Sequence, residues 1–268
     1  MSNNYVHGYT ELETNRLNDQ AQTLSSLLHH DSVFPEGSEV LEAGCGVGAQ
    51  TVILGKKNPD IQLTSIDISD ESLWMAKKRC FDSKVSNVKF LQADIYNLPF
   101  DKESFDHVFV CFVLEHLPDP QEALFELKKI LKPGGTLTAI EGDHGSAYYY
   151  PPSKYAQLTI NCLINLQAIK GGDSLIGRSL FPLFQKTGFN NIKVSPRVVY
   201  ADSSLPEMVD GFTKKTFIAM VEGVRKDAIR ENLISEDNWE RGISDLKETA
   251  KDTGTFNYTF FKAVATKC

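Results

Sequence analysis

Short apolar segments alternate with amphipathic segments along the first half of the chain. The segments 39–44 (EVLEAG) and 105–113 (FDHVFVCFV) are mostly apolar and lie between turn residues, which is typical of buried strands. Apolar residues at three- and four-residue spacing, such as Leu124, Leu127 and Leu131, indicate helices that bury one face. The pattern predicts strands over 39–44, 61–67, 88–94, 105–113 and 136–141, and helices over 11–30, 49–59, 70–81 and 119–131.

The second half of the chain is less regular. Its alternating apolar residues predict strands over 191–201 and 255–267. Helical spacing predicts a helix over 153–172, another over 178–189, and two more within 205–251.

The regular alternation of strands and helices predicts an α/β fold with a doubly wound, mostly parallel sheet, in which crossovers are right-handed. Ligands of such sheets bind beyond the carboxyl ends of the strands. The candidate functional residues are therefore those that end the predicted strands: Glu42 to Gly48, Asp67, Asp94, Cys111 to His116, and Glu141 to His144.

Composition narrows the class of protein further. A hydrophobic fraction of 41% and a charged fraction of 24% are those of an ordinary globular protein. The net charge of −7 disfavours a nucleic-acid partner, and no segment predicts a signal peptide or a membrane span. The five cysteines form no C-x-x-C pair, which disfavours a disulfide framework and favours a reducing, cytoplasmic location. No histidine or cysteine spacing indicates a metal site.

The glycine-rich segment 39–49 (EVLEAGCGVGA) fits two kinds of cofactor site. Gly44, Gly46 and Ala49 match the G-x-G-x-x-G/A fingerprint of dinucleotide sites. Glu42 followed by Gly44, Gly46 and Gly48 matches the acid-x-G-x-G-x-G loop of S-adenosylmethionine sites. A carboxylate beside a pyrophosphate is unfavourable, whereas it can help to organise a loop around a cationic ligand, so Glu42 mildly favours S-adenosylmethionine.

Two further carboxylates end the next strands. Asp67 can accept hydrogen bonds from both ribose hydroxyls in either cofactor class, or it can cap the following helix. Asp94 can accept a hydrogen bond from the adenine amino group while the Ile95 amide donates to a ring nitrogen, or Asp94 can be a turn residue. Asp94 discriminates better, since its position matches that of the other strand-end residues.

Four motifs in order resemble the class I S-adenosylmethionine-dependent methyltransferases, and within them the small-molecule branch of ubiquinone and menaquinone C-methyltransferases. The motifs are VLEAGCGVGAQT, TSIDIS, VKFLQADIYNLPFDKESFDHVFVCFVLEHLPDP and LKKILKPGGTLTAIE. They cover about residues 37–142. The resemblance implies a Rossmann-like sheet of seven strands with an antiparallel last strand and helical cap insertions.

The resemblance also implies roles for the matching residues. A helical cover over 1–36 would precede the methyltransferase domain over 37–268, whose cap segments would span about 145–180 and 203–252. Tyr5 or Tyr9 would fold over S-adenosylmethionine, or else pack at the terminus. The expected cofactor contacts are Glu42, Gly44, Cys45, Gly46 and Gly48 around the methionine part, Asp67 and Ile68 at the ribose and adenine edge, Ala93, Asp94 and Ile95 at the adenine, and Cys111 at the methionine side.

The methyl acceptor is expected to be a small molecule, and its atom and identity stay open. His144 is a candidate base or substrate-orienting residue and Asp143 a candidate substrate contact, because both follow the fifth predicted strand; a solvated loop histidine is the alternative. Two other functions stay in view: a non-catalytic S-adenosylmethionine-binding module, and a dinucleotide-dependent oxidoreductase, which Asp94 and the later motifs oppose.

Overall fold

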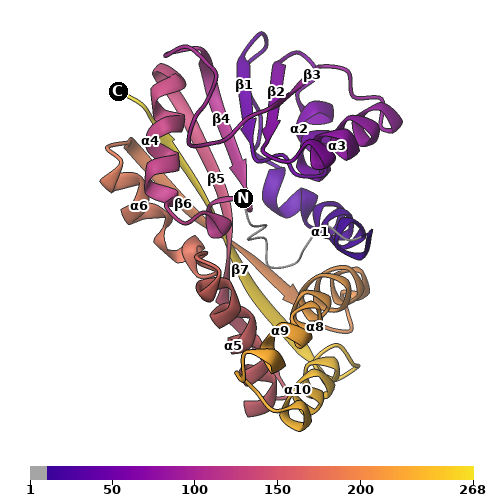
Figure 1. The fold of residues 1–268 in the computed structure, drawn as a ribbon. Coiled ribbons are helices and arrows are strands. Elements are labelled where there is room, and N and C mark those ends of the chain that lie inside the picture. Colours follow the sequence, from indigo (N-terminus) through magenta and orange to yellow (C-terminus); the bar gives the residue numbers. More distant parts are fainter. Residues whose placement is uncertain (1–10) are drawn as a thin grey trace. The chain divides into compact units, whose positions relative to one another are not determined.

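The structure is a computed structural model that describes residues 11–268, and its strands form one seven-stranded sheet in the order β3-β2-β1-β4-β5-β7-β6 (Figure 1). The strands are β1 (Glu39–Ala43), β2 (Gln62–Asp67), β3 (Val88–Gln92), β4 (Phe105–Cys111), β5 (Leu131–Tyr150), β6 (Asn190–Ala201) and β7 (Thr255–Thr266). The expected doubly wound α/β fold is confirmed.

Strand direction changes between β5 and its neighbour β7. The pairs β3–β2, β2–β1, β1–β4 and β4–β5 are parallel. β7 runs the other way, since the Lys267 amide donates to the Gly135 carbonyl (2.9 Å) whereas the Thr259 amide donates to the Ser146 hydroxyl (2.9 Å). The predicted antiparallel last strand is therefore confirmed. It lies beside β5, the last of the parallel strands that the alternating motifs predicted.

The helices in the described residues range from a single turn to the 19 residues of the first helix. They are α1 (Glu11–His29), α2 (Ala49–Lys57), α3 (Asp70–Asp82), α4 (Pro120–Ile130), α5 (Lys154–Ile169), α6 (Leu180–Lys186), α7 (Pro206–Met208), α8 (Ala219–Gly223), α9 (Arg225–Arg230) and α10 (Glu236–Glu248), with 3-10 turns at Leu114–His116 and Ile176–Ser179 and a π-helix at Val209–Ile218.

Side-chain caps fix where α3 and α4 begin. The Ser69 hydroxyl accepts a hydrogen bond from the Ser72 amide (3.2 Å), which confirms the predicted cap of α3. The Asp119 carboxylate accepts one from the Glu122 amide (2.9 Å), and Pro120 occupies the first helical position.

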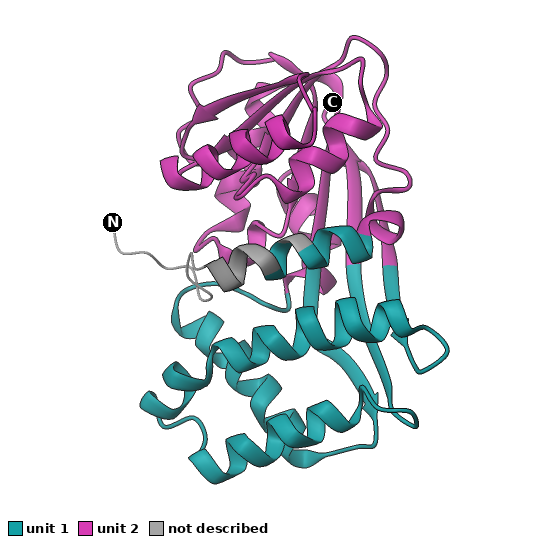
Figure 2. Cartoon of the chain, turned by 90° about the vertical axis from the view of Figure 1, so that its right-hand side faces the viewer, with its two compact units in different colours: residues 1–24, 142–175, 197–260 teal, residues 25–141, 176–196, 261–268 magenta. Residues whose placement is uncertain are grey.

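The chain divides into two compact units (Figure 2). Unit 1 contains the described residues up to 24 together with 142–175 and 197–260, and unit 2 contains 25–141, 176–196 and 261–268. The strands β5, β6 and β7 contribute residues to both units.

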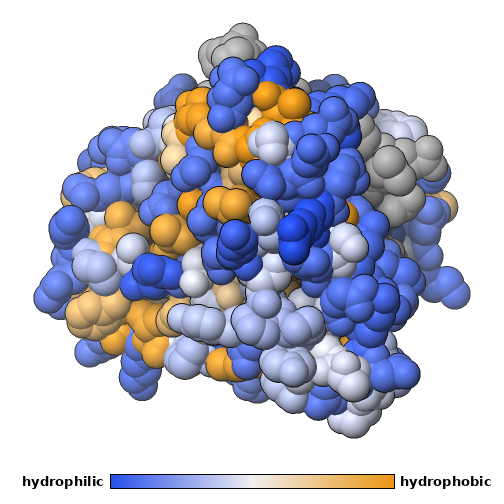
Figure 3. All heavy atoms as spheres, turned by 90° about the horizontal axis from the view of Figure 1, so that it is seen from below, coloured by the Kyte–Doolittle hydropathy of each residue, from blue (hydrophilic) through white to orange (hydrophobic). Residues whose placement is uncertain are grey.

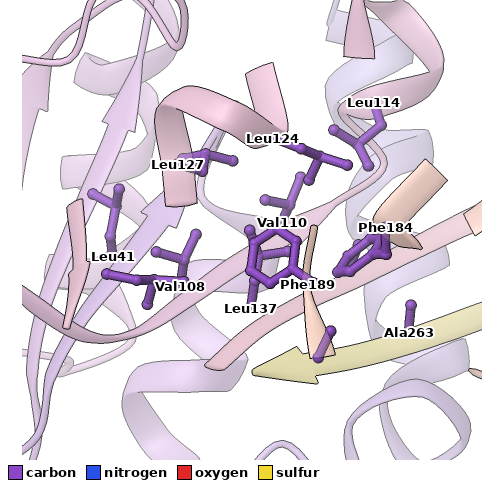
Figure 4. Close-up of a cluster of buried hydrophobic side chains, with 14 of the residues drawn as sticks. Leu41, Val108, Val110, Leu114, Leu124, Leu127, Leu137, Phe184, Phe189 and Ala263 are labelled. Atoms are coloured by element: carbon purple, nitrogen blue, oxygen red, sulfur yellow. The ribbon is translucent and has the colours of Figure 1, made fainter. Parts of the chain in front are cut away.

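The core of unit 2 lies around the central strands β1, β4 and β5 (Figure 4). The side chains of Val108 and Val110 on β4 are fully buried, as are Leu124 and Leu127 on α4. Central strands of a parallel sheet bury both faces, which explains the continuous apolar segment that predicted β4. This core supports the carboxyl ends of the parallel strands.

Unit 1 has an aromatic core of its own. Phe212 and Phe217 on the π-helix pack against Phe256 and Tyr258 on β7, with ring centroids between 4.7 and 6.1 Å apart. Helices α5 and α10 pack together in the same unit, where Gly242 lies so close to α5 that a Cβ atom would sit 2.5 Å from the Tyr155 carbonyl oxygen.

Two segments differ from the sequence-based expectation. β5 begins at Leu131 and ends at Tyr150, whereas the pattern predicted 136–141, because the KPGG segment continues the strand instead of only separating it from α4. Five helical segments replace the two predicted within 205–251, and Gly223 ends one of them.

A buried histidine ends α1. His29 is 2% exposed, and its Nε2 atom lies 2.8 Å from Oε1 of Gln50. Burial lowers the pKa of His29 from 6.5 to about 4, so its imidazole is neutral at neutral pH. The contribution of His29 to the stability of the fold is therefore lost as the pH falls from about 6.5 towards 4.

Hydrophilic residues dominate the face of the chain shown in Figure 3, and hydrophobic residues form smaller groups among them. Among residues 11–268, none of the helices has both the length and the hydropathy needed to cross a bilayer.

Candidate active site

The register of the parallel strands brings the predicted cofactor residues of unit 2 to one edge of its sheet. Ala43 pairs with Ile66, Asp67 with Gln92, and Cys111 with Ile140. The residues that directly follow these strands therefore emerge side by side. This edge is where a doubly wound sheet binds its ligands.

The glycine loop after β1 needs glycine at three positions. Gly44, Gly46 and Gly48 have φ values of 77°, 51° and 79°, a region that other residues rarely adopt. Their surroundings differ. A Cβ on Gly44 would lie 2.5 Å from the Val113 side chain and one on Gly48 would lie 2.7 Å from Cα of Ala76, whereas one on Gly46 would meet nothing within 4 Å. Gly44 and Gly48 thus serve packing, and Gly46 leaves its backbone open to a ligand.

Asp67 ties this loop to the end of β2. Its Oδ2 atom accepts a hydrogen bond from the Gly46 amide (2.8 Å), and Oδ1 accepts one from the Ser69 amide (2.9 Å). Partial burial raises the pKa of Asp67, and the backbone hydrogen bonds oppose that rise. Each carboxylate oxygen has a second lone pair, so Asp67 can still accept hydroxyl groups of a ligand.

Glu42 lies inside the fold beneath the loop. It is 2% exposed, and its Oε2 atom accepts hydrogen bonds from the hydroxyls of Thr51 (2.7 Å) and Ser65 (2.6 Å). Burial raises the pKa of Glu42 from 4.5 to about 7 despite both hydrogen bonds. Glu42 therefore links β1, β2 and α2, and nothing in the sequence pattern singled out Thr51 or Ser65 as its partners.

Glu42→Gln is expected to remove a pH dependence of stability. Between about pH 4.5 and 7 the folded chain holds a proton on Glu42 that the unfolded chain releases, so this residue's contribution falls as the pH rises. The fall is up to about 1.4 kcal/mol per pH unit and ends near pH 7. Glutamine stays neutral and can accept both hydroxyl hydrogen bonds.

Urea unfolding of the wild type and Glu42→Gln across this range measures the effect. The advantage of the variant should grow from about pH 5 to 7 and then stay level. A difference that is the same at every pH would show that Glu42 does not titrate in this way.

The third predicted strand end presents both polar and apolar groups. Asp94 forms a turn in which its Oδ1 atom accepts the Tyr96 amide (2.9 Å). Ile68 is 56% exposed at the end of β2, whereas Ala93 and Ile95 are half-buried against the core of unit 2. The side chain of Ile68 is thus open to a flat apolar ligand group.

The two cysteines predicted as cofactor contacts are buried thiols. Cys45 and Cys111 are 5% and 9% exposed, and burial raises the pKa of both. Neither is suited to act as a nucleophile, which requires a thiolate.

Asp143 and His144 belong to unit 1, and both lie within β5 instead of in a loop after it. His144 is 5% exposed, and its Nδ1 atom lies 2.7 Å from the Tyr258 hydroxyl, with the Phe217 ring edge-on at 6.3 Å. Asp143 is 2% exposed and accepts the Gly145 amide (3.0 Å). The alternative of a solvated loop histidine is excluded by this burial.

Tyr258 was not among the sequence candidates. It lies 114 residues after His144, and the alternating segment 255–267 indicated only a strand. Tyr5 and Tyr9 lie outside the described residues.

Comparison with known proteins agrees with the motif pattern. Residues 41–139 match the methyltransferase-domain family. Demethylmenaquinone methyltransferase of Staphylococcus aureus is 36% identical over 107 residues, which are 40% of this chain and 44% of that protein. The chain thus spans less than half the length of the curated relatives it matches. The similarity to class I methyltransferases of the quinone-methylating kind is confirmed over this segment.

Solved structures share the fold over most of the chain at low identity. Phosphoethanolamine N-methyltransferase 2 of Haemonchus contortus, in complex with S-adenosyl-L-methionine, has a TM-score of 0.56 and 19% identity over 92% of this chain and 52% of its own. The [4+2]-cyclase SpnF has a TM-score of 0.56 and 18% identity over 93% of this chain and 81% of its own. At such identities the likeness concerns the fold alone.

Proposed function

We propose that this chain is an S-adenosylmethionine-dependent methyltransferase that acts on a small-molecule acceptor. One observation carries the proposal: the loop after β1 holds three glycines at positive φ, and Asp67 anchors the amide of the middle one within the segment that matches methyltransferase domains. The open backbone at Gly46 would suit S-adenosylmethionine and a dinucleotide equally well. The choice of S-adenosylmethionine therefore rests on the matched segment.

The described residues fit S-adenosylmethionine. Gly46 leaves space where a side chain would stand, Asp67 has lone pairs for the ribose hydroxyls, and the exposed Ile68 can cover one adenine face. Asp94 and the amide of Ile95 are the proposed partners of the adenine edge. Glu42, Gly44, Cys45, Gly48, Ala93 and Cys111 complete the proposed cofactor set, and Tyr9 is proposed as its cover.

S-adenosylmethionine supplies a methyl group on a sulfonium, which is already a strong electrophile. The chain must bind the cofactor, orient an acceptor in line with the S–CH3 bond and exclude water. An oxygen or nitrogen acceptor also requires removal of a proton. We propose His144 as the base or orienting residue and Asp143 as a substrate contact, with the Tyr258 hydroxyl fixing the His144 ring.

The proposal for the acceptor concerns the segments outside the matched domain. We propose that residues of about 145–180 and 203–252 select the acceptor, because the methyltransferase match ends at residue 139. The helical cover over 1–36 and the domain over 37–268 form the proposed organisation.

The Staphylococcus aureus relative is a demethylmenaquinone methyltransferase, so a quinone is the first class of acceptor to test. A cytoplasmic location is proposed from the five cysteines, all of which are free thiols.

Titration calorimetry with S-adenosylmethionine, S-adenosylhomocysteine and NAD tests the cofactor. Binding of the first two and not of NAD is expected. Binding of NAD alone would overturn the proposal.

Methyl transfer itself needs a separate test, since a cyclase shares this fold and fold does not determine reaction. The chain should transfer label from methyl-labelled S-adenosylmethionine to a component of a metabolite extract. Cofactor binding with no labelled product across broad extracts would instead favour a non-methylating role.

A further inference from the structure

Glu141 is a buried carboxyl group of unit 2 that the proposed function does not use. It is fully buried, at the end of the part of β5 that belongs to that unit. Its Oε1 atom accepts hydrogen bonds from the amides of Val113 (3.1 Å) and Leu114 (2.8 Å). Its Oε2 atom has no hydrogen-bond partner among the described residues. Burying an incompletely hydrogen-bonded carboxyl group costs free energy, so its presence in the core needs an explanation.

The segment that Glu141 holds is a strained turn. Phe112, directly after β4, has a φ of 58°, where a bulky residue is a clear outlier. The Phe112 amide donates to the Ile140 carbonyl (2.9 Å), and the next two amides donate to Glu141. β5 therefore fixes this turn through the backbone of one residue and the side chain of the next. Strain of this kind persists only where the surroundings hold it in place.

This strained turn also supports the glycine loop. The Val113 side chain fills the position beside Gly44, where a Cβ atom would lie only 2.5 Å from Cγ2 of Val113. Moving the turn would move Val113 away from Gly44 or into it. The line of contact thus runs from Glu141 through Val113 to the first glycine of the loop.

We propose that Glu141 is a positioning residue of the cofactor site: by accepting the Val113 and Leu114 amides, it sets Val113 against Gly44 and fixes the glycine loop for S-adenosylmethionine. This inference rests on the proposed function. It assigns Glu141 no contact with the cofactor or the acceptor.

The surroundings of this carboxyl group favour its neutral form. Burial raises the pKa of Glu141 well above its ordinary value, and the nearby Glu115 carboxylate raises it further, while the backbone hydrogen bonds oppose the rise. Glutamine is neutral and has the same shape, and its carbonyl oxygen can accept both amides. Glu141→Gln should therefore keep the turn, whereas leucine at this position accepts neither amide.

Calorimetric affinity for S-adenosylmethionine tests the proposal in the full-length chain. Glu141→Leu should weaken binding about fivefold, which corresponds to about 1 kcal/mol, and Glu141→Gln should stay within about twofold of the wild type. Leu127→Ala is the matched control, because it opens the core of the same unit while Glu141 and Val113 both remain, and it should leave affinity unchanged. Hydrogen exchange of the Val113 and Leu114 amides should accelerate only in Glu141→Leu.

Val113→Ala keeps the proposal testable if Glu141→Leu does not fold. It retains Glu141 and removes the two methyl groups of Val113 nearest to Gly44, so it too should weaken binding. Wild-type affinity in Val113→Ala or Glu141→Leu, or equal loss in Glu141→Gln and Glu141→Leu, would overturn the positioning role alone. A wild-type chain that does not bind S-adenosylmethionine would overturn the proposed function, and this inference with it.

Discussion

Asp67→Ala is expected to weaken S-adenosylmethionine binding by more than about tenfold while the chain remains folded. The change removes the acceptor of the Gly46 amide and the proposed acceptor of the ribose hydroxyls. Hydrogen bonds to a charged group contribute about 1.5–3 kcal/mol, and about 1.4 kcal/mol corresponds to a factor of ten in affinity. Calorimetric titration measures the dissociation constant, and circular dichroism checks the fold.

Asp67→Asn separates the two roles of this carboxylate. Its amide oxygen can still accept the Gly46 amide, but the side chain has lost its charge and one acceptor oxygen. We expect an affinity between those of the wild type and Asp67→Ala. Unchanged affinity in Asp67→Ala would remove Asp67 from the cofactor site.

Gly48→Ala is expected to lower the free energy of unfolding by about 2–5 kcal/mol. A residue with a Cβ atom at a φ of 79° costs about 1–2 kcal/mol. The Cβ would also lie 2.7 Å from Cα of Ala76, and overpacking of this kind costs about 1–3 kcal/mol. Because the clash is with the backbone of α3, it cannot be relieved by a rotamer change. Urea unfolding gives the value.

Gly37→Ala is the matched control for this prediction. Gly37 has nearly the same φ, 76°, yet nothing lies within 4 Å of a Cβ placed there. Only the conformational cost of about 1–2 kcal/mol should appear. Equal losses in the two variants would mean that contact with Ala76 does not constrain the loop.

The sequence predicted the architecture of the matched segment well because each element there carries its own local signal. Ser69 precedes an amphipathic segment and caps α3, and the apolar segment 105–113 forms the central strand β4. Strand order then places Asp67 and the glycine loop at one edge without any knowledge of side-chain contacts. The strand-end rule depends only on topology, so it holds before packing is known.

Contacts between distant residues were not predictable in this way. The hydroxyls of Thr51 and Ser65 reach Glu42 from separate elements, and Tyr258 meets His144 across 114 residues. Asp143 and His144 followed the predicted end of a strand and therefore suggested a loop, but β5 continues through both. Pairing partners of a strand determine where it ends, and no local pattern reports them.

The shifted pKa values of His29 and Glu42 have a calorimetric consequence. Near about pH 5.5, unfolding takes up nearly one proton at His29 and releases nearly one from Glu42. The two exchanges cancel, so this pair adds no dependence of the unfolding heat on the ionisation enthalpy of the buffer. Replacing either residue alone uncovers the proton exchange of the other, and heats measured in phosphate and in an amine buffer then diverge.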